Sequence, residues 1–160
     1  RAPAELVDAA LRDAAGAGAV EVEGALIRTP GWRPALTAGQ RSALEALRGC
    51  LAEAGREPPS VAELEAAHGA DTPALLRLLE REGAAVAVEE TRYYAPPALA
   101  ELVAALRRNM EPGREYGPAE LRDFLGVSRK YLIPLLEYCD RQGVTDRHAT
   151  GRVLRPAASV

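Results

Sequence analysis

The chain has 160 residues, of which 48% are hydrophobic and 27% charged, and its formal net charge is −3 at pH 7. This composition is typical of a globular chain with one domain or with two or three small ones. The sequence has no apolar run near the roughly 18 residues that cross a bilayer and no signal-peptide pattern, so we expect a cytoplasmic protein without a membrane partner.

Charge is distributed unevenly along the chain. Residues 128–160 carry six Lys or Arg against three acids, whereas the rest of the chain carries 14 against 20. A nucleic-acid footprint would therefore be confined to the C-terminal end. Cys50 and Cys139 are far apart on apolar helix faces, which indicates two reduced thiols, and the two histidines are equally isolated. We expect no metal site and no cofactor.

The first segment, 1–33, predicts one helix over about 3–15 and a hairpin in the alternating stretch 19–32, with its turn at Gly24. A helix and a hairpin of this size cannot bury a core. We interpret the segment as the remnant of a truncated winged-helix module, its last helix plus wing, which leans on the next module with Trp32 packed between them.

The middle module, 34–95, predicts three helices and a hairpin. A first helix over about 37–54 ends before two prolines, Ser60 caps a short second helix, and Asp71 caps a third. The stretch 84–95 then alternates as a hairpin. Three helices followed by a two-stranded wing are typical of a winged helix.

The last module, 96–160, repeats this order of elements. Gly117 to Gly143 reads as a helix-turn-helix, with Gly126 as a left-handed stop and Ser128 as the N-cap of a third helix about one turn longer than its counterpart. A hairpin follows. The predicted fold is mainly α with small β-hairpins (α+β), built of tandem winged-helix modules. The apolar stripe of the first helix in this module consists of Leu99, Leu102, Val103, Leu106 and Met110.

Two features mark the third helix of the last module. Arg129 and Lys130 occupy its first turn, where the helix dipole favours acids, so an external anion such as a phosphate would relieve the mismatch. Pro134 lies inside the helix, where it removes a backbone donor. It either bends or loosens the first turn around Ser128 to Lys130 and shapes the binding turn, or is tolerated on the solvent side.

The sequence offers no catalytic residue. Lys130 is the only lysine, so a phosphate-binding loop of the GxxxxGK[ST] form cannot exist here, and GxSxG, HExxH and paired-cysteine motifs are absent. We expect no enzyme in this chain.

The run SRKYLIPLLEYCDRQGVT at 128–145, followed by Arg147 and by RVL at 152–154, resembles the end of the bacterial selenocysteine-specific elongation factor SelB. The match includes Pro134, and the middle module is similar more loosely. At the wing tip Ala149 and Thr150 stand where the family commonly has Gly-Asp.

The resemblance implies a fragment of a larger GTPase whose GTP- and tRNA-binding part lies elsewhere. The last module of that family binds a hairpin in the selenoprotein mRNA, the selenocysteine insertion (SECIS) element, and so directs recoding of a UGA codon. The middle module would then be a spacer and the last module the RNA-binding reader. We expect a monomer, with the ribosome as a further partner.

The expected RNA site combines the start of the third helix with the wing. Because the major groove of A-form RNA is too deep for side chains to read, the hairpin loop is the readable part. Cations would hold loop phosphates, and a loop base would stack on Tyr131 or His148. The alternative is that Tyr131 packs in the core and His148 is an idle surface residue. The predicted RNA-binding residues are Ser128, Arg129, Lys130, Tyr131, Arg147, His148 and Arg152.

Two other functions remain open at this point. A winged-helix DNA-binding regulator would need a third helix that is basic along its length, but Glu137 and Asp140 interrupt that face. A protein-interaction scaffold would suit the acidic residues 1–127. Gel shifts with a stem-loop RNA, a loop-mutated RNA and duplex DNA separate these possibilities.

Overall fold

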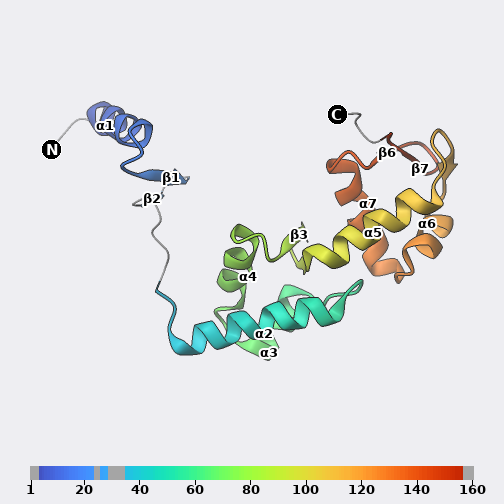
Figure 1. The fold of residues 1–160 in the computed structure, drawn as a ribbon, viewed down its shortest axis with the longest axis horizontal. Coiled ribbons are helices and arrows are strands. Elements are labelled where there is room, and N and C mark those ends of the chain that lie inside the picture. Colours follow the sequence, from blue (N-terminus) through green and yellow to red (C-terminus); the bar gives the residue numbers. More distant parts are fainter. Residues whose placement is uncertain (1–3, 24–25, 29–34, 157–160) are drawn as a thin grey trace. The chain divides into compact units, whose positions relative to one another are not determined.

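The computed structural model describes residues 4–23, 26–28 and 35–156 of the chain. The chain forms two compact units, Arg1–Leu36 and Thr37–Val160 (Figure 1). No helix within the described ranges is long and apolar enough to cross a membrane.

The first unit contains the predicted helix and the two predicted strands. Val7 and Ile27 remain about half exposed, as expected for a segment too short to bury a core. The predicted turn at Gly24 and the predicted packing of Trp32 lie outside the described residues. The elements are α1 (Ala4–Gly16), β1 (Glu21–Glu23) and β2 (Leu26–Arg28), and the two strands pair antiparallel.

The middle module has the predicted three helices and wing. Thr37 and Ser60 are N-caps with complete capping boxes, because Gln40 and Glu63 bond back to the cap backbone. The first helix buries the predicted stripe of Leu44, Leu47 and Leu51. The elements are α2 (Ala38–Ala54), α3 (Val61–His68), α4 (Thr72–Arg81), β3 (Val86–Glu89) and β4 (Arg92–Tyr94).

The last module repeats this order with one addition, the two-residue strand β5, which the sequence analysis missed. It pairs with β7, so the wing belongs to a three-stranded antiparallel sheet of order β5-β7-β6. Helix α7 has 13 residues and α4 has 10, which confirms the predicted extra turn. The elements are α5 (Pro96–Asn109), β5 (Glu115–Tyr116), α6 (Pro118–Leu125), α7 (Arg129–Arg141), β6 (Thr145–Arg147) and β7 (Arg152–Leu154).

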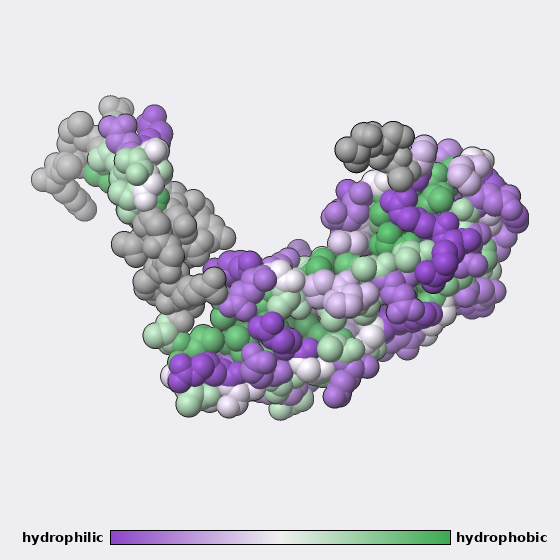
Figure 2. All heavy atoms as spheres, in the orientation of Figure 1, coloured by the Kyte–Doolittle hydropathy of each residue, from purple (hydrophilic) through white to green (hydrophobic). Residues whose placement is uncertain are grey.

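One hydrophobic cluster joins the two modules of the second unit. Val88 and Tyr94 of the middle wing belong to the same buried cluster as Leu106, Leu121 and Leu136 of the last module. On the visible face of this unit, the surface of the last module is largely hydrophilic, with apolar patches between the hydrophilic residues (Figure 2). The division at residues 95 and 96 stays a prediction, because both modules lie in one compact unit.

Candidate nucleic-acid interface

Helix α7 begins at the predicted turn. Gly126 ends α6 in the left-handed region (φ 61°, ψ 38°), and Ser128 is the extended N-cap (φ −74°, ψ 161°). The Ser128 carbonyl accepts from the Tyr131 N–H, three residues on, whereas the N-cap carbonyls of α2 to α6 accept from the fourth residue. The first turn of α7 therefore begins with a 3₁₀-type hydrogen bond, which is tighter than the bent or loosened turn predicted from Pro134.

An acid from the middle module already lies at the start of α7. The Ser128 N–H donates to Oε1 of Glu57, in the loop between α2 and α3, at 2.5 Å. Hydrogen bonds from Ser128 lower the pKa of Glu57, and the charge of Lys130 lowers it further. This corrects the prediction of an external anion at that amide, because the chain supplies its own carboxylate to the positive end of the helix dipole.

Arg129, Lys130 and Arg147 are among the exposed cations of the last module. The side chains of Arg129 and Arg147 make no hydrogen bond or ion pair with any residue that the structure describes. The Lys130 ammonium lies 4.8 Å from the centre of the Tyr131 ring and is otherwise exposed. These side chains can reach an anionic ligand without breaking an existing ion pair.

A cavity of about 180 Å³ lies between α7 and the wing. Ile133, one helical turn after Arg129, lines it from α7 and is 44% exposed, so its apolar side chain is open to the cavity. Arg147 and His148 line it from the wing, and His148 is exposed. The structure thus brings the predicted wing residues to the same hollow as one face of α7.

Tyr131 is placed differently from the prediction of a base-stacking platform. Its side chain is buried in the cluster shared by the modules, and its hydroxyl donates to the Glu57 carbonyl at 3.4 Å. The Arg92 guanidinium lies 4.6 Å from the ring centre. The ring is therefore a packing element between the modules, which was the alternative interpretation of the sequence.

Arg152 also departs from the prediction of an exposed phosphate contact. Only 7% of its side chain is exposed, and its Nε donates to both carboxylate oxygens of Asp140 at 3.1 and 3.0 Å. The Thr145 hydroxyl donates to the same carboxylate at 2.6 Å. Arg152 thus belongs to a buried network that ties the wing to the end of α7.

The wing tip is braced by β5. The backbone N–H and the hydroxyl of Thr150 both donate to Oε1 of Glu115, and these bonds lower the pKa of Glu115. Gly151 lies so close to the Tyr116 carbonyl that a Cβ would overlap it. Thr150, a departure from the common family pattern, therefore has a structural partner in this chain.

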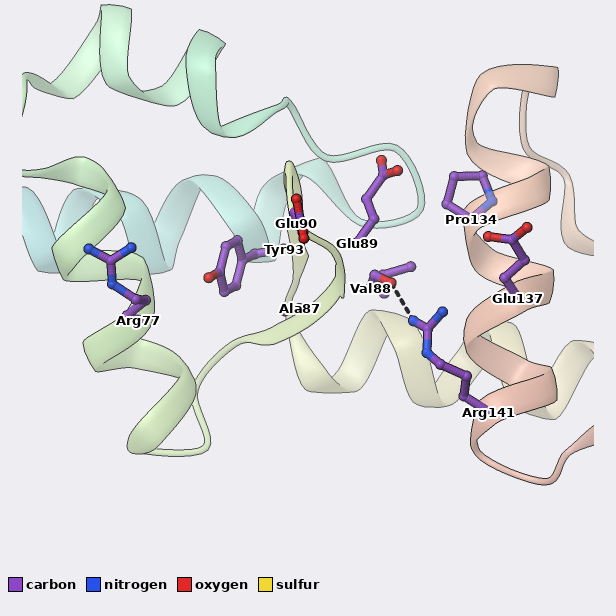
Figure 3. Close-up of a pocket in the computed structure, with 9 residues that line it drawn as sticks. All are labelled: Arg77, Ala87, Val88, Glu89, Glu90, Tyr93, Pro134, Glu137 and Arg141. Atoms are coloured by element: carbon purple, nitrogen blue, oxygen red, sulfur yellow. Dashed lines mark hydrogen bonds between the residues drawn. The ribbon is translucent and has the colours of Figure 1, made fainter. Parts of the chain in front are cut away.

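A second, larger hollow of about 640 Å³ separates the middle wing from α7 (Figure 3). The Arg141 side chain extends from α7 toward the middle wing and donates to the Val88 carbonyl at 2.6 Å. Glu89 and Glu137 face it from the two sides, with Pro134 beside Glu137. The mixed charge of this hollow contrasts with the cationic start of α7.

The comparisons with known proteins agree on one family. Residues 110–154, which hold α6, α7 and the three-stranded sheet, match the family described as elongation factor SelB, winged helix. The mRNA-binding domain of SelB from E. coli, solved in complex with SECIS RNA, is similar in structure, with 29% identity and a TM-score of 0.64. The similarity covers 76% of this chain and 100% of the E. coli domain. The chain is a C-terminal winged-helix region of the SelB type.

Longer relatives support this assignment. The selenocysteine-specific elongation factor of Desulfomicrobium baculatum is 32% identical over 141 residues, which are 86% of this chain and 22% of that protein. The factor of E. coli K-12 is 35% identical over 106 residues, 64% of this chain and 17% of that protein. The chain thus spans about a fifth of the length of these SelB relatives, and what it matches is a winged-helix region and not a catalytic domain.

A crystal structure of bacterial EF-Sec also matches, with a TM-score of 0.63 over 95% of the chain at 21% identity, which shows a shared fold. No sequence pattern indicates Glu57, which lies 71 positions from its partner Ser128. Ile133 could have been found from its four-residue spacing to Arg129 on the cationic face of this SelB-type helix.

Proposed function

We propose that this chain is the mRNA-binding part of a selenocysteine-specific translation elongation factor, and that its last module recognises a SECIS hairpin to direct recoding of a UGA codon. The observation that carries the proposal is that Arg129 and Lys130 at the start of α7 and Arg147 on the wing are exposed on the module that matches the SelB winged helix. The E. coli domain with the related fold was solved with such a hairpin.

The cations suit the phosphates of a folded loop. An arginine offers a planar fork for bidentate contact with phosphate, and Lys130 acts as a point charge. Since α7 cannot enter the deep major groove of an A-form stem, its first turn approaches the loop instead. Glu57 holds the Ser128 amide, so the side chains of the first turn, and not that amide, make the contacts.

An unstacked loop base would enter the cavity between α7 and the wing. Ile133 provides an apolar wall and His148 a ring at the rim, whereas Tyr131 is buried and unavailable. Sequence-specific RNA recognition uses such splayed-out loop bases, which stack on side chains and bond through their edges.

The whole protein would act in the cytoplasm beside the ribosome, as a monomer. Its GTPase activity and tRNA binding would belong to the part of the relatives that this chain does not span. Within the chain, the middle module would set the distance between that part and the RNA reader.

Fluorescence anisotropy with labelled RNA tests the proposal. We expect tight binding to the E. coli SECIS hairpin, or to members of a pool with randomised loops, and much weaker binding to loop-mutated hairpins and to duplex DNA. The triple variant Arg129→Ala, Lys130→Ala, Arg147→Ala should lose most of the affinity. Equal affinity for every RNA and for DNA, or no RNA binding, would contradict the proposal.

A matched control comes from the middle module. Arg41, Arg77 and Arg81 are also exposed and make no ion pair with a described residue. Their triple alanine variant loses three positive charges, as the first variant does. It should bind the hairpin nearly as the wild type does. A loss as large as that of the first variant would assign the affinity to overall charge.

A further inference from the structure

Arg152 is the one charged residue among the described residues that is buried, with a relative exposure of 6%. Its Nε faces the Asp140 carboxylate, at 3.0 Å from Oδ2, and this carboxylate is in turn held by the fully buried Thr145. Three elements, the end of α7 and both wing strands, therefore fix the plane of this guanidinium.

The two terminal nitrogens of Arg152 have no such partner. They make no hydrogen bond with a described residue, and a guanidinium that uses only Nε leaves four N–H donors unmet. The polar side-chain atoms that are both enclosed and unpartnered in the described part are Thr72 Oγ1 and Tyr94 OH, so the Arg152 nitrogens reach the surface. The surface that Arg152 lines is the cavity between α7 and the wing.

The charges around Arg152 determine which kind of ligand atom can accept hydrogen bonds from its terminal nitrogens. Asp140 neutralises the guanidinium at hydrogen-bond distance, and Glu137 also lines the cavity. Arg147 lines the same cavity and its side chain has no ion-pair partner among the described residues, so a phosphate would bind at Arg147 and not at Arg152, whose charge Asp140 already balances. A neutral acceptor with a partial negative charge, such as a base carbonyl, still satisfies the fork.

We propose that Asp140 is a positioning residue that aims Arg152 at an uncharged base carbonyl of the bound RNA loop, so that Arg152 reads sequence while Arg129, Lys130 and Arg147 bind phosphates. The inference rests on the proposed function. It goes beyond that function because it gives Arg152, which is buried and neutralised by Asp140, a different role from the exposed cations that bind phosphates and release counterions.

The first test replaces the fork and keeps the charge. Arg152→Lys retains a cation beside Asp140 but cannot present a planar pair of donors to a carbonyl. We expect its melting temperature to stay near that of the wild type and its affinity for the SECIS hairpin to fall about tenfold or more. Wild-type affinity in Arg152→Lys would overturn the inference.

The second test uses the salt dependence of binding. Each phosphate contact contributes about 0.7 to 0.9 to the slope of log affinity against log salt, whereas a base carbonyl contributes none. Arg152→Lys should therefore leave the slope unchanged. Asp140→Asn should weaken binding and steepen the slope, because an unbalanced guanidinium attracts a phosphate.

Thr145→Val is the matched control, since it loosens the same network without changing a charge. Its slope should equal that of the wild type, and its affinity, corrected for the folded fraction, should fall less than that of Asp140→Asn. If all three variants lose affinity only in proportion to unfolding, Asp140 and Arg152 are structural and the inference is wrong.

The third test locates the base. Hairpins with an abasic residue at each loop position in turn are measured against the wild type and Arg152→Lys. At one position the two changes should be non-additive, because both remove the same contact. Additive losses at every position would overturn the inference, while failure of the wild-type chain to bind any hairpin would overturn the proposed function instead.

Discussion

The third helices of the two winged modules, α4 and α7, follow one plan but begin with opposite charge. Asp71 is the N-cap residue of α4, but its carboxylate accepts from Gln40 at 2.9 Å and makes no hydrogen bond to the helix backbone as a cap. Helix α7 starts with Ser128 and two cations, and its acid comes from Glu57 in the other module. Supplying the acid from outside the helix leaves its opening positions free for ligand-binding cations.

Substitutions in the core shared by the modules should have the largest effect, and they test whether α4 and α7 belong to one cooperative unit. Leu76 of α4 and Leu136 of α7 are both fully buried. Leu136→Ala and Leu76→Ala should each cost about 2–5 kcal/mol of unfolding free energy. Urea denaturation followed by circular dichroism should show that residues 37–160 unfold in a single transition in both variants, because Val88 and Tyr94 link the cores of the two modules. Two separate transitions would make the modules independent.

The wing should be the next most sensitive region. In Gly151→Ala the new methyl group overlaps the Tyr116 carbonyl, so β5 must move and stability should fall by about 1–3 kcal/mol. Gly49→Ala in α2 is the control, since nothing lies within 4 Å and alanine favours a helix by about 0.5–1 kcal/mol. Thermal melts should move in opposite directions for the two variants; a shift of the same sign in both would remove the role given to β5.

The cationic turn of α7 should matter for binding and not for folding. Arg129→Ala should weaken SECIS hairpin binding about tenfold, as expected for one charged hydrogen-bonded contact of about 1.5 kcal/mol, and should lower the salt slope by about 0.7 to 0.9. The control is Arg77→Ala, an exposed arginine of α4. Unchanged melting temperatures are expected for both, and a destabilised Arg129→Ala would show a structural residue instead.

Acid pH should loosen the cap of α7 by a smaller amount. The pKa of Glu57 in the folded chain is lowered from its ordinary value of 4.5. Its stabilising contribution is therefore present above pH 4.5 and is lost as the pH falls through the folded-state pKa. Hydrogen exchange should show faster exchange of the Ser128 amide in Glu57→Gln, and a weaker dependence of that exchange on acid pH than in the wild type.

Glu63→Gln is the control for this pH effect. Glu63 also has a lowered pKa, caused by hydrogen bonds from Ser60 in its own capping box. The substitution should affect the start of α3 and leave the Ser128 amide unchanged. An equal effect of both variants on that amide would mean that acid acts on the whole unit and not on the Glu57 contact.

Local patterns were enough to predict most of the architecture. Capping residues such as Ser60, the left-handed Gly126 and the stripe of Leu44, Leu47 and Leu51 act within one helix or turn, and the structure has each where the sequence places it. The strand β5 escaped prediction because two residues cannot show an alternating pattern, and its pairing with β7 depends on contacts distant in sequence.

The site was predicted less completely, for a physical reason. Arg129 and Lys130 lie in the first turn of α7, before its apolar stripe begins at Leu132, and this local position is enough to predict that they are exposed. The burial of Arg152 and Tyr131 depends on partners from other elements, Asp140 and the Glu57 backbone, and no local pattern encodes those distances. Arginine in a strand looks the same in sequence whether it meets water or a carboxylate.

The junction at Ala95 limits where the chain can be cut or extended. Strand β4 ends at Tyr94 and α5 begins at Pro96, so a single buried residue connects the modules, and the proline restricts its backbone. A fluorescent protein or a cleavage site inserted there would disrupt the hydrophobic cluster that the two modules share. The exposed bend at 111–114, between α5 and β5 of the last module, is the better place for a probe.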